Sequence, residues 1–202
     1  MNETKRKRGR PATIDTSAAM RSLVELFRSK GYAAVSLDDL SDATGLSRPS
    51  LYRAFGNKLS MYIGAMDAFG DQVAESAVPA MLADGPLEQA VSGFFDAMLS
   101  IYYRDSDIAP GCLVFGTAPS AAEEAQIQAR LDDGIKQLDE LMRGRIRQAA
   151  PEASEDQLQT AVEIGANTLI AFSARAKSGA TKTALSAMGQ RSAKTICALV
   201  GC

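Results

Sequence analysis

The chain of 202 residues is long enough to bury a core, as one large domain or two modest ones, and its formal net charge is only −2. The absence of histidine removes the commonest general base and metal ligand, so we expect no metal, no cofactor and no histidine-dependent catalytic triad. The sequence has no run of 18 apolar residues and no secretory signal, so we expect a cytoplasmic protein without a membrane partner.

Helix-forming residues dominate the composition, and no stretch alternates in the way of a strand, which predicts an all-α fold. Nine helices are expected, over residues 16–30, 37–43, 48–55, 58–77, 86–103, 112–118, 121–149, 154–177 and 181–200. Gly31 ends the first of these helices, Ser36 and Ser47 cap the second and third, and Ser154 with Gln157 forms a capping-box-like start further on.

Charge is distributed unequally along the chain. Residues 1–60 hold 11 Lys and Arg and 6 Asp and Glu, a net charge of +5, whereas residues 61–202 hold 11 and 18, a net charge of −7. This asymmetry favours contact with a polyanion through the first third alone. We predict two domains, an N-terminal arm with a three-helix unit over 1–60 and a helical remainder over 61–202, which share the helix that begins at 58.

Residues 37–55 have the length of a helix-turn-helix, with Gly45 in the short turn between the two helices. Leu40 and Leu51 are expected to face inward, which leaves the second helix a polar face of hydrogen-bond donors. The start of such a helix enters the major groove of DNA, where arginine grips guanine and hydroxyl or lysine side chains hold phosphates. The candidate DNA-binding residues are Thr44, Ser47, Arg48, Pro49, Ser50, Tyr52, Arg53 and Lys58. The alternative is a solvated helical hairpin with ordinary surface arginines.

The stretch SLDDLSDATGLSRPSLYRAFGNKLSMY resembles the DNA-binding signature of the TetR family of bacterial transcriptional regulators. The signature is a capped helix, a turn with Gly, a Ser, a basic residue and then Leu-Tyr-x-x-Phe with a Lys, and residues 51–55 and Lys58 fall on it in register. The resemblance implies an all-α homodimer with a three-helix DNA-binding domain and a C-terminal domain for ligand binding and dimerisation.

The resemblance also implies roles for single residues. Tyr52 and Lys58 match phosphate contacts, while Arg48 and Ser50 match positions that reach bases. Pro49 departs from the family pattern, which often has a small residue such as glycine there, and it removes an amide that could have met a phosphate. Leu59 stands where an acid is usual, and Ser41 replaces a common alanine; these changes leave the expected fold intact.

The N-terminal tail carries a short second motif, Arg8-Gly9-Arg10-Pro11. It is similar to the core of an AT-hook-like arm, in which the two arginines lie in a narrow minor groove. We therefore add Arg8 and Arg10 to the candidate DNA-binding residues. The alternative is a charged, solvated tail.

A small-molecule effector would need an apolar cavity with a few polar groups. The candidates to line it, mostly within 58–77, 86–103 and 112–118, are Met66, Phe69, Phe94, Phe95, Met98, Tyr102, Cys112, Phe115, Met142 and Phe172; each could equally be plain core. Cys112 follows Gly111 at a helix start, so its thiol is either an activated group of lowered pKa or a small buried side chain. The three cysteines lack metal-like or CxxC spacing and so fit a reducing compartment.

The last two helices are rich in small residues, which let helices approach closely. In the family these helices pair with their two-fold mates; the alternative is close packing within one chain. The reading that joins these features is a ligand-responsive regulator, a repressor that binds a palindromic operator as a homodimer and is released by an effector. The competing hypotheses are a helical small-molecule carrier or enzyme with an incidental basic tail, and an adaptor for acidic proteins.

Overall fold

The computed structural model of the protein describes residues 15–104 and 109–202, and within these ranges it contains ten α-helices, one 3-10 turn and no strand. The smaller, N-terminal group consists of α1 (Thr16–Ala34), α2 (Leu37–Thr44) and α3 (Arg48–Phe55). The remaining helices are α4 (Lys58–Ser76), α5 (Val78–Leu82), α6 (Leu87–Tyr102), α7 (Leu113–Thr117), α8 (Ala125–Ala149), α9 (Glu155–Lys177) and α10 (Lys182–Val200), with the 3-10 turn η1 (Ala118–Ala121) before α8. The predicted all-α fold is confirmed.

Each of the nine predicted helices is present. Gly31, predicted to end the first helix, has a left-handed φ of 77° and kinks the chain there, but α1 continues beyond it to Ala34. Two other differences arise at prolines. The helix that begins at residue 58 was expected to break near Pro79. A new short helix, α5, instead begins at Val78 and includes Pro79, which is tolerated because a proline in the first helical turn loses no intrahelical hydrogen bond. The helix expected from residue 121 begins only at Ala125, since the preceding residues, with Pro119, form the 3-10 turn.

The helix starts follow the predicted capping chemistry with one exception. Ser36 forms a full capping box with Asp39, and Ser154 forms one with Gln157. Ser47 occupies the N-cap position of α3, but its hydroxyl donates to the Ser50 hydroxyl at 3.0 Å and accepts no amide proton.

A cap through the Ser47 side chain was therefore the wrong expectation. Pro49 removes one of the two amides that such a cap serves, and the amide of Ser50 donates to the Ser47 carbonyl at 2.9 Å instead.

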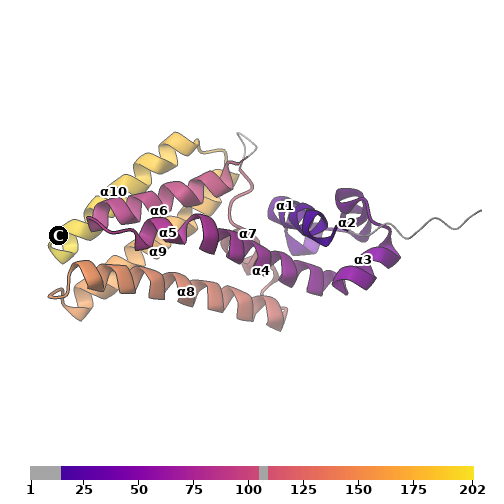
Figure 1. The fold of residues 1–202 in the computed structure, drawn as a ribbon, viewed down its shortest axis with the longest axis horizontal. Coiled ribbons are helices and arrows are strands. Elements are labelled where there is room, and N and C mark those ends of the chain that lie inside the picture. Colours follow the sequence, from indigo (N-terminus) through magenta and orange to yellow (C-terminus); the bar gives the residue numbers. More distant parts are fainter. Residues whose placement is uncertain (1–14, 105–108) are drawn as a thin grey trace, which may run out of the picture.

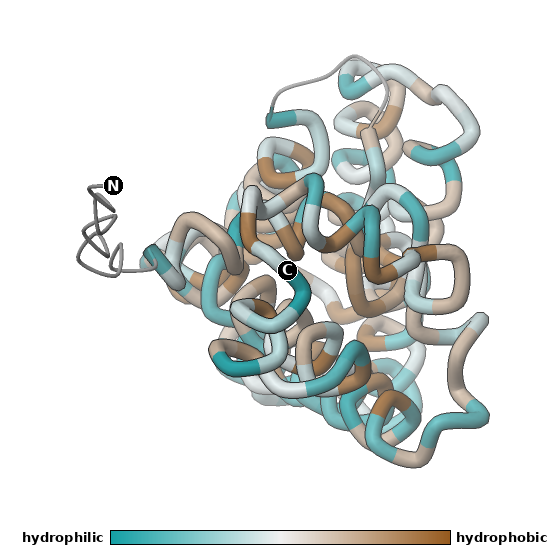
Figure 2. The backbone as a smooth tube through the Cα atoms, turned by 90° about the vertical axis from the view of Figure 1, so that its right-hand side faces the viewer, coloured by the Kyte–Doolittle hydropathy of each residue, from teal (hydrophilic) through white to brown (hydrophobic). Residues whose placement is uncertain are grey.

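Helices α1 to α3 gather at one end of the molecule, and α4 runs from them into the larger bundle of α5, α6, α8, α9 and α10 (Figure 1). Hydrophilic and hydrophobic stretches alternate along the helices, so each has a side that can pack inward (Figure 2). The two parts share one core, because Phe27 of α1 meets Tyr62 of α4 edge to face at a centroid distance of 5.0 Å and both side chains are fully buried. A domain boundary near residue 60 stays a prediction.

Close helix packing within the chain explains two of the small residues in the last helices. A Cβ atom added to Gly165 of α9 would lie 3.0 Å from the Met142 sulfur, and one added to Gly189 of α10 would lie 3.1 Å from the rings of Phe95 and Phe172. These glycines therefore let α8, α9, α6 and α10 approach one another. The predicted intermolecular role of the two C-terminal helices has to rest on other residues.

Candidate nucleic-acid interface and ligand cavity

The helix-turn-helix is built as its sequence pattern predicted. Leu40 and Leu51 are buried, and Gly45 ends α2 in the left-handed conformation, with φ at 67°, that a glycine adopts without strain. With its apolar side turned inward, α3 exposes Arg48 and Arg53 together with Tyr52, whose surface is 45% accessible. A large aromatic side chain this exposed, between two arginines, is suited to a charged partner rather than to the core.

The hydroxyls of the turn are used differently from one another. The Thr44 hydroxyl donates to the Leu40 carbonyl at 2.7 Å and accepts from the amide of Leu46, so it secures the turn itself. The hydroxyls of Ser47 and Ser50 bond to each other on the surface side of α3. Thr44 is therefore a structural residue in this state, whereas the serine pair can exchange its mutual bond for another partner.

Arg48 is held on the surface by an acidic neighbour. Its guanidinium lies 2.5 Å from a carboxylate oxygen of Asp38 on α2, and both side chains are more than half exposed. Hydrogen bonding to Asp38 raises the pKa of Arg48, which therefore stays charged. To reach DNA, this arginine must exchange Asp38 for a phosphate or a base.

Lys58 is partly withdrawn from solvent at the start of α4. Its ammonium lies 4.7 Å from the centre of the Tyr32 ring and donates to the Ala33 carbonyl at 3.4 Å. Burial lowers the pKa of Lys58, and the nearby Asp39 carboxylate, itself paired with Lys30, opposes that shift. The predicted phosphate ligand is thus preorganised by packing on the tyrosine. Arg8 and Arg10, the predicted minor-groove arm, lie outside the described residues.

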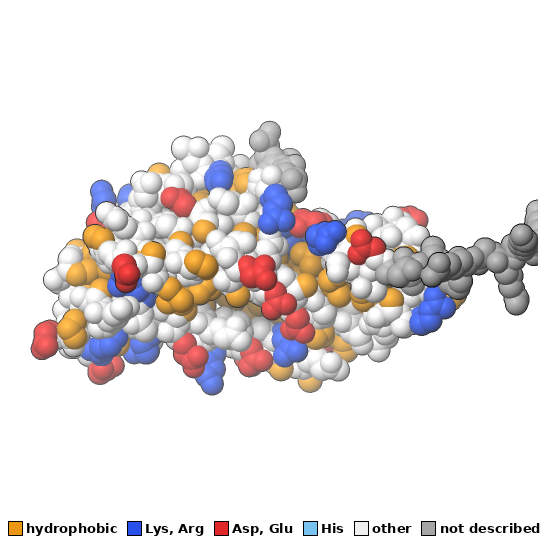
Figure 3. Space-filling view, in the orientation of Figure 1, with side chains coloured by type: hydrophobic (Ala, Val, Ile, Leu, Met, Phe, Trp, Pro, Cys, Tyr) orange, Lys and Arg blue, Asp and Glu red, His pale blue; other side chains and the backbone are white. Residues whose placement is uncertain are grey.

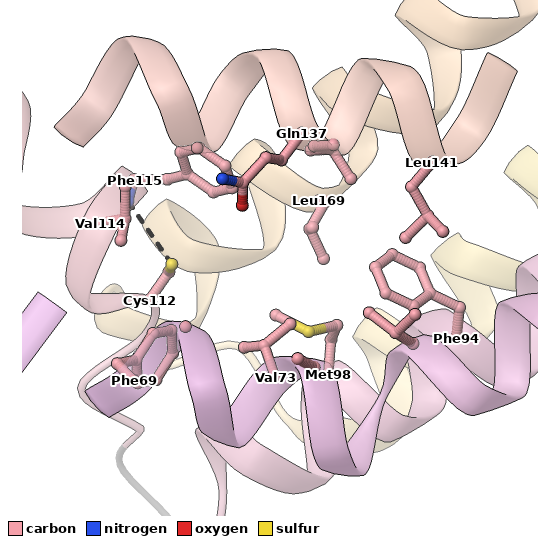
Figure 4. Close-up of a pocket in the computed structure, with 15 residues that line it drawn as sticks. Phe69, Val73, Phe94, Met98, Cys112, Val114, Phe115, Gln137, Leu141 and Leu169 are labelled. Atoms are coloured by element: carbon pink, nitrogen blue, oxygen red, sulfur yellow. Dashed lines mark hydrogen bonds between the residues drawn. The ribbon is translucent and has the colours of Figure 1, made fainter. Parts of the chain in front are cut away.

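A cavity of about 290 Å³ opens inside the larger bundle (Figure 4). Helices α4, α6, α7, α8 and α9 and the first residue of α5 supply its walls, and its lining is almost entirely apolar. It is lined by Phe69, Gly70, Val73, Ala74, Val78, Phe94, Met98, Cys112, Val114, Phe115, Gly134, Gln137, Leu138, Leu141 and Leu169. Figure 4 shows the Gln137 amide pointing from α8 into the space between these walls.

Half of the residues predicted for a pocket take part in this lining. Those that do are Phe69, Phe94, Met98, Cys112 and Phe115. Those that do not are Met66, Phe95, Tyr102, Met142 and Phe172, which are buried in the core instead. These residues lie on sides of their helices that face other helices rather than the cavity. The ring centres of Phe95 and Phe172 are 5.4 Å apart, where α6 meets α9. Met142 packs closely against Gly165 of α9.

Sequence reasoning missed the walls that α8 and α9 contribute. The lining residues Gly134, Leu138 and Leu141 recur every three or four positions, with Gln137 among them, which is the spacing of one helical face. That stripe was a usable signal for a surface turned toward a neighbour. Which helix would face it could not be read from the spacing.

Cys112 has the character of a buried side chain rather than of an activated thiol. It occupies the N-cap position of α7, where its sulfur accepts from the amide of Phe115 at 3.4 Å (Figure 4). Burial nevertheless raises the pKa of Cys112, which outweighs the amide hydrogen bonds. The thiol of lowered pKa, one of the two readings of the sequence, is the wrong one for this structure.

A buried arginine joins helix α1 of the N-terminal group to the cavity wall, and sequence reasoning did not single it out. The side chain of Arg28 on α1 is 2% exposed; its guanidinium donates to the Gly111 carbonyl at 2.9 and 3.0 Å and to the Ile101 carbonyl at 3.3 Å. It also lies 5.3 Å from the centre of the Phe69 ring, which lines the cavity. A signal for its burial was present in the sequence, because Arg28 follows Val24 by four residues and so lies on the apolar face of the helix.

None of the helices in the described ranges combines the length and the apolar composition that crossing a bilayer requires. A family model described as "Bacterial regulatory proteins, tetR family" matches residues 20–64, which include the whole helix-turn-helix.

Two curated relatives are similar over part of the chain. The "HTH-type transcriptional repressor ComR" of Escherichia coli (strain K12) is 30% identical over 122 residues, 60% of this chain and 58% of the relative. The "Uncharacterized HTH-type transcriptional regulator YezE" of Bacillus subtilis (strain 168) is 26% identical over 110 residues, 54% of this chain and 56% of the relative. The chain therefore spans less than two thirds of the length of these relatives.

Solved structures extend the likeness in fold to nearly the whole chain. A cysteine mutant of the TetR family transcriptional regulator CifR, complexed with a 26bp double-strand operator DNA, aligns with a TM-score of 0.76, 24% identity and coverage of 92% of this chain and 98% of that chain. A TetR transcriptional regulator from Legionella pneumophila aligns with a TM-score of 0.72 at 16% identity, over 92% and 98% of the two chains. The family model therefore places residues 20–64 among the bacterial regulatory proteins of the tetR family, and the solved structures share the fold of nearly the whole chain.

Proposed function

We propose that the protein is a DNA-binding transcriptional repressor that binds a palindromic operator as a homodimer and is released when a small molecule occupies the cavity. Its site of action would be the cytoplasm, where a bacterial operator is found. The observation that carries the proposal is the surface of α3, on which Arg48, Tyr52 and Arg53 are exposed while Leu51 anchors the helix from behind. Such a helix can place donors on base edges and phosphates of a major groove.

Ligand control is supported by the position of Arg28. From α1, next to the helix-turn-helix, Arg28 donates to the carbonyl of Gly111, the residue before the cavity-lining Cys112. Its guanidinium also contacts the ring of Phe69, which lines the cavity. A ligand that displaces Phe69 or α7 would therefore alter the support of α1. To switch operator binding, the ligand must favour one arrangement of the dimer over the other by a few kcal/mol.

Dimerisation through α9 and α10 completes the proposal. A single α3 reads only a few base pairs, whereas two copies related by a two-fold axis read half-sites about 34–36 Å apart, one turn of B-DNA, or a multiple of that distance. On α9, Ile170 is an exposed large hydrophobic residue that such an interface would cover.

The alternative is a helical carrier or an enzyme in which the cavity is the functional site and the basic tail is incidental. The relatives reported above carry the names of transcriptional regulators, which disfavours this alternative. Binding of duplex DNA separates the two functions directly.

The test selects bound duplexes from a random pool and then measures the affinity of the chosen operator at several salt concentrations. A repressor should bind with a log–log salt slope of about −0.9 for each phosphate neutralised, whereas a carrier should bind no duplex. Arg53→Ala, which removes an exposed charge of α3, should weaken binding, while Arg104→Ala, an exposed arginine after α6, should not. Equal effects of the two variants would refute the assignment of α3.

A further inference from the structure

The described part of the cavity lining contains no ionisable acid or base other than one thiol. Among the described residues that form it, the only polar side chains are those of Gln137 and Cys112, and burial keeps the Cys112 thiol protonated by raising its pKa. A charged ligand group inside would lose its hydration without gaining a counter-ion, a cost that proteins avoid by pairing buried charges. The lining therefore favours uncharged ligands.

The approach to the cavity adds discrimination against anions. A second hollow shares Gly70, Gln137 and three further residues with the cavity and carries Asp67, Asp71 and Asp133 around Arg130. The Arg130 guanidinium is engaged by two of these carboxylates, at 2.9 Å from Asp67 and 3.8 Å from Asp133. A row of acidic side chains is visible where α4 passes α8 (Figure 3). The surplus of negative charge repels an approaching carboxylate or phosphate.

The size of the ligand follows from the volume. An apolar cavity of about 150 Å³ accepts benzene, so the present cavity of about 290 Å³ has room for about twice that molecule, two fused rings. One hydrogen bond is available to such a ligand from a wall residue, because the Gln137 amide projects into the space (Figure 4).

We propose that the cavity binds uncharged, largely apolar molecules of about ten non-hydrogen atoms, with one hydroxyl, carbonyl or amine group bonded to the Gln137 amide. The proposal rests on the proposed function only in treating this cavity as the effector site; the binding itself is measured without DNA. In this proposal, Gln137 discriminates between ligands of the same shape with and without a polar group. The acidic residues around the neighbouring hollow discriminate against anions.

The test compares three probes that share one ring system: naphthalene, 2-naphthol and the anion 2-naphthoate. The chain contains no tryptophan, so the background to the fluorescence of the probes comes from its five tyrosines alone. The wild-type protein should bind naphthalene and 2-naphthol and should bind 2-naphthoate at least tenfold more weakly. Gln137→Leu should remove a preference for 2-naphthol over naphthalene of about threefold to tenfold, the value of one neutral hydrogen bond. The matched control is Gln126→Leu, an exposed glutamine of the same helix, which should change nothing.

Gly70→Leu tests the location of the bound probe. Gly70 lines the cavity on α4 at an exposed position, and a Cβ atom added there meets no atom within 4 Å, so a side chain can begin there without a clash, and leucine also favours the helix. This variant should stay folded by circular dichroism and lose at least tenfold in affinity for 2-naphthol. Unchanged affinity in folded Gly70→Leu would overturn the proposal, as would equal binding of 2-naphthoate or no binding of 2-naphthol by folded wild type.

Operator binding is measured separately in the presence of 2-naphthol. If 2-naphthol binds as described but leaves operator affinity unchanged, the ligand class is supported and ligand control by this class fails. If operator binding is present but no probe binds, the ligand class is refuted and the DNA-binding function stands. The two proposals can therefore fail independently.

Discussion

Replacing the buried Arg28 by methionine should destabilise the protein by about 2–4 kcal/mol. Methionine fills much of the same space, so the loss comes from polar contacts rather than from a cavity. The Gly111 and Ile101 carbonyls lose their guanidinium donors, at a cost of about 1–3 kcal/mol for each buried acceptor left unpaired. The contact with the Phe69 ring contributes about 0.5–2 kcal/mol more. Removing a charge that was costly to bury offsets part of this loss.

Thermal unfolding followed by circular dichroism measures the effect. For a chain of this size, about 2–4 kcal/mol corresponds to a decrease in Tm of roughly 5–15 °C. The control is Arg21→Met on the same helix, where the arginine is exposed and the change should stay within about 0.5 kcal/mol. If Arg28→Met and Arg21→Met unfold at the same temperature, the buried arginine contributes no net stability, and the argument from its hydrogen bonds is refuted.

Three further outcomes are expected. Asp38→Asn frees the arginine that begins the DNA-facing helix, so duplex affinity at low salt should rise several-fold and the salt slope should steepen by about one unit; Asp42→Asn, on the same helix, is the control, and an equal rise in both variants would assign the effect to net charge alone. Gly111→Ala should cost about 2–5 kcal/mol in urea unfolding, because φ is +75° and the new Cβ would lie 2.8 Å from a backbone oxygen. Gly179→Ala, where φ is +89° but the space is open, should cost only the strain of its backbone conformation, and equal losses in the two variants would refute the steric argument. Iodoacetamide at pH 8 should label the exposed C-terminal thiol quickly and Cys112 slowly, since burial both shields this sulfur and raises its pKa; mass spectrometry showing fast labelling of Cys112 would restore the reactive-thiol reading.

Much of the candidate DNA-binding surface could be predicted from the sequence, because its determinants are local. The capping box of Ser36, the left-handed turn at Gly45 and the inward-facing Leu51 act within a few residues of one another. They fix the boundaries of α2 and α3 and the side of α3 that faces the core. The polar residues on the opposite side of α3 are then exposed to solvent. Even there, Ser47 occupies the predicted N-cap position without the expected side-chain hydrogen bond to an amide, because the proline two residues later removes one of the amides that such a bond serves.

The cavity was decided by tertiary structure. Apolar residues such as Phe94 and Phe95 are neighbours in sequence and chemically identical, yet one lines the cavity and the other packs on Phe172, since only the arrangement of α6, α8 and α9 determines which side is hollow. The same holds for Arg28, whose acceptors lie 73 and 83 residues away in the chain. A helical period gives the direction of a side chain around its own axis, but what that side chain meets depends on helices distant in sequence.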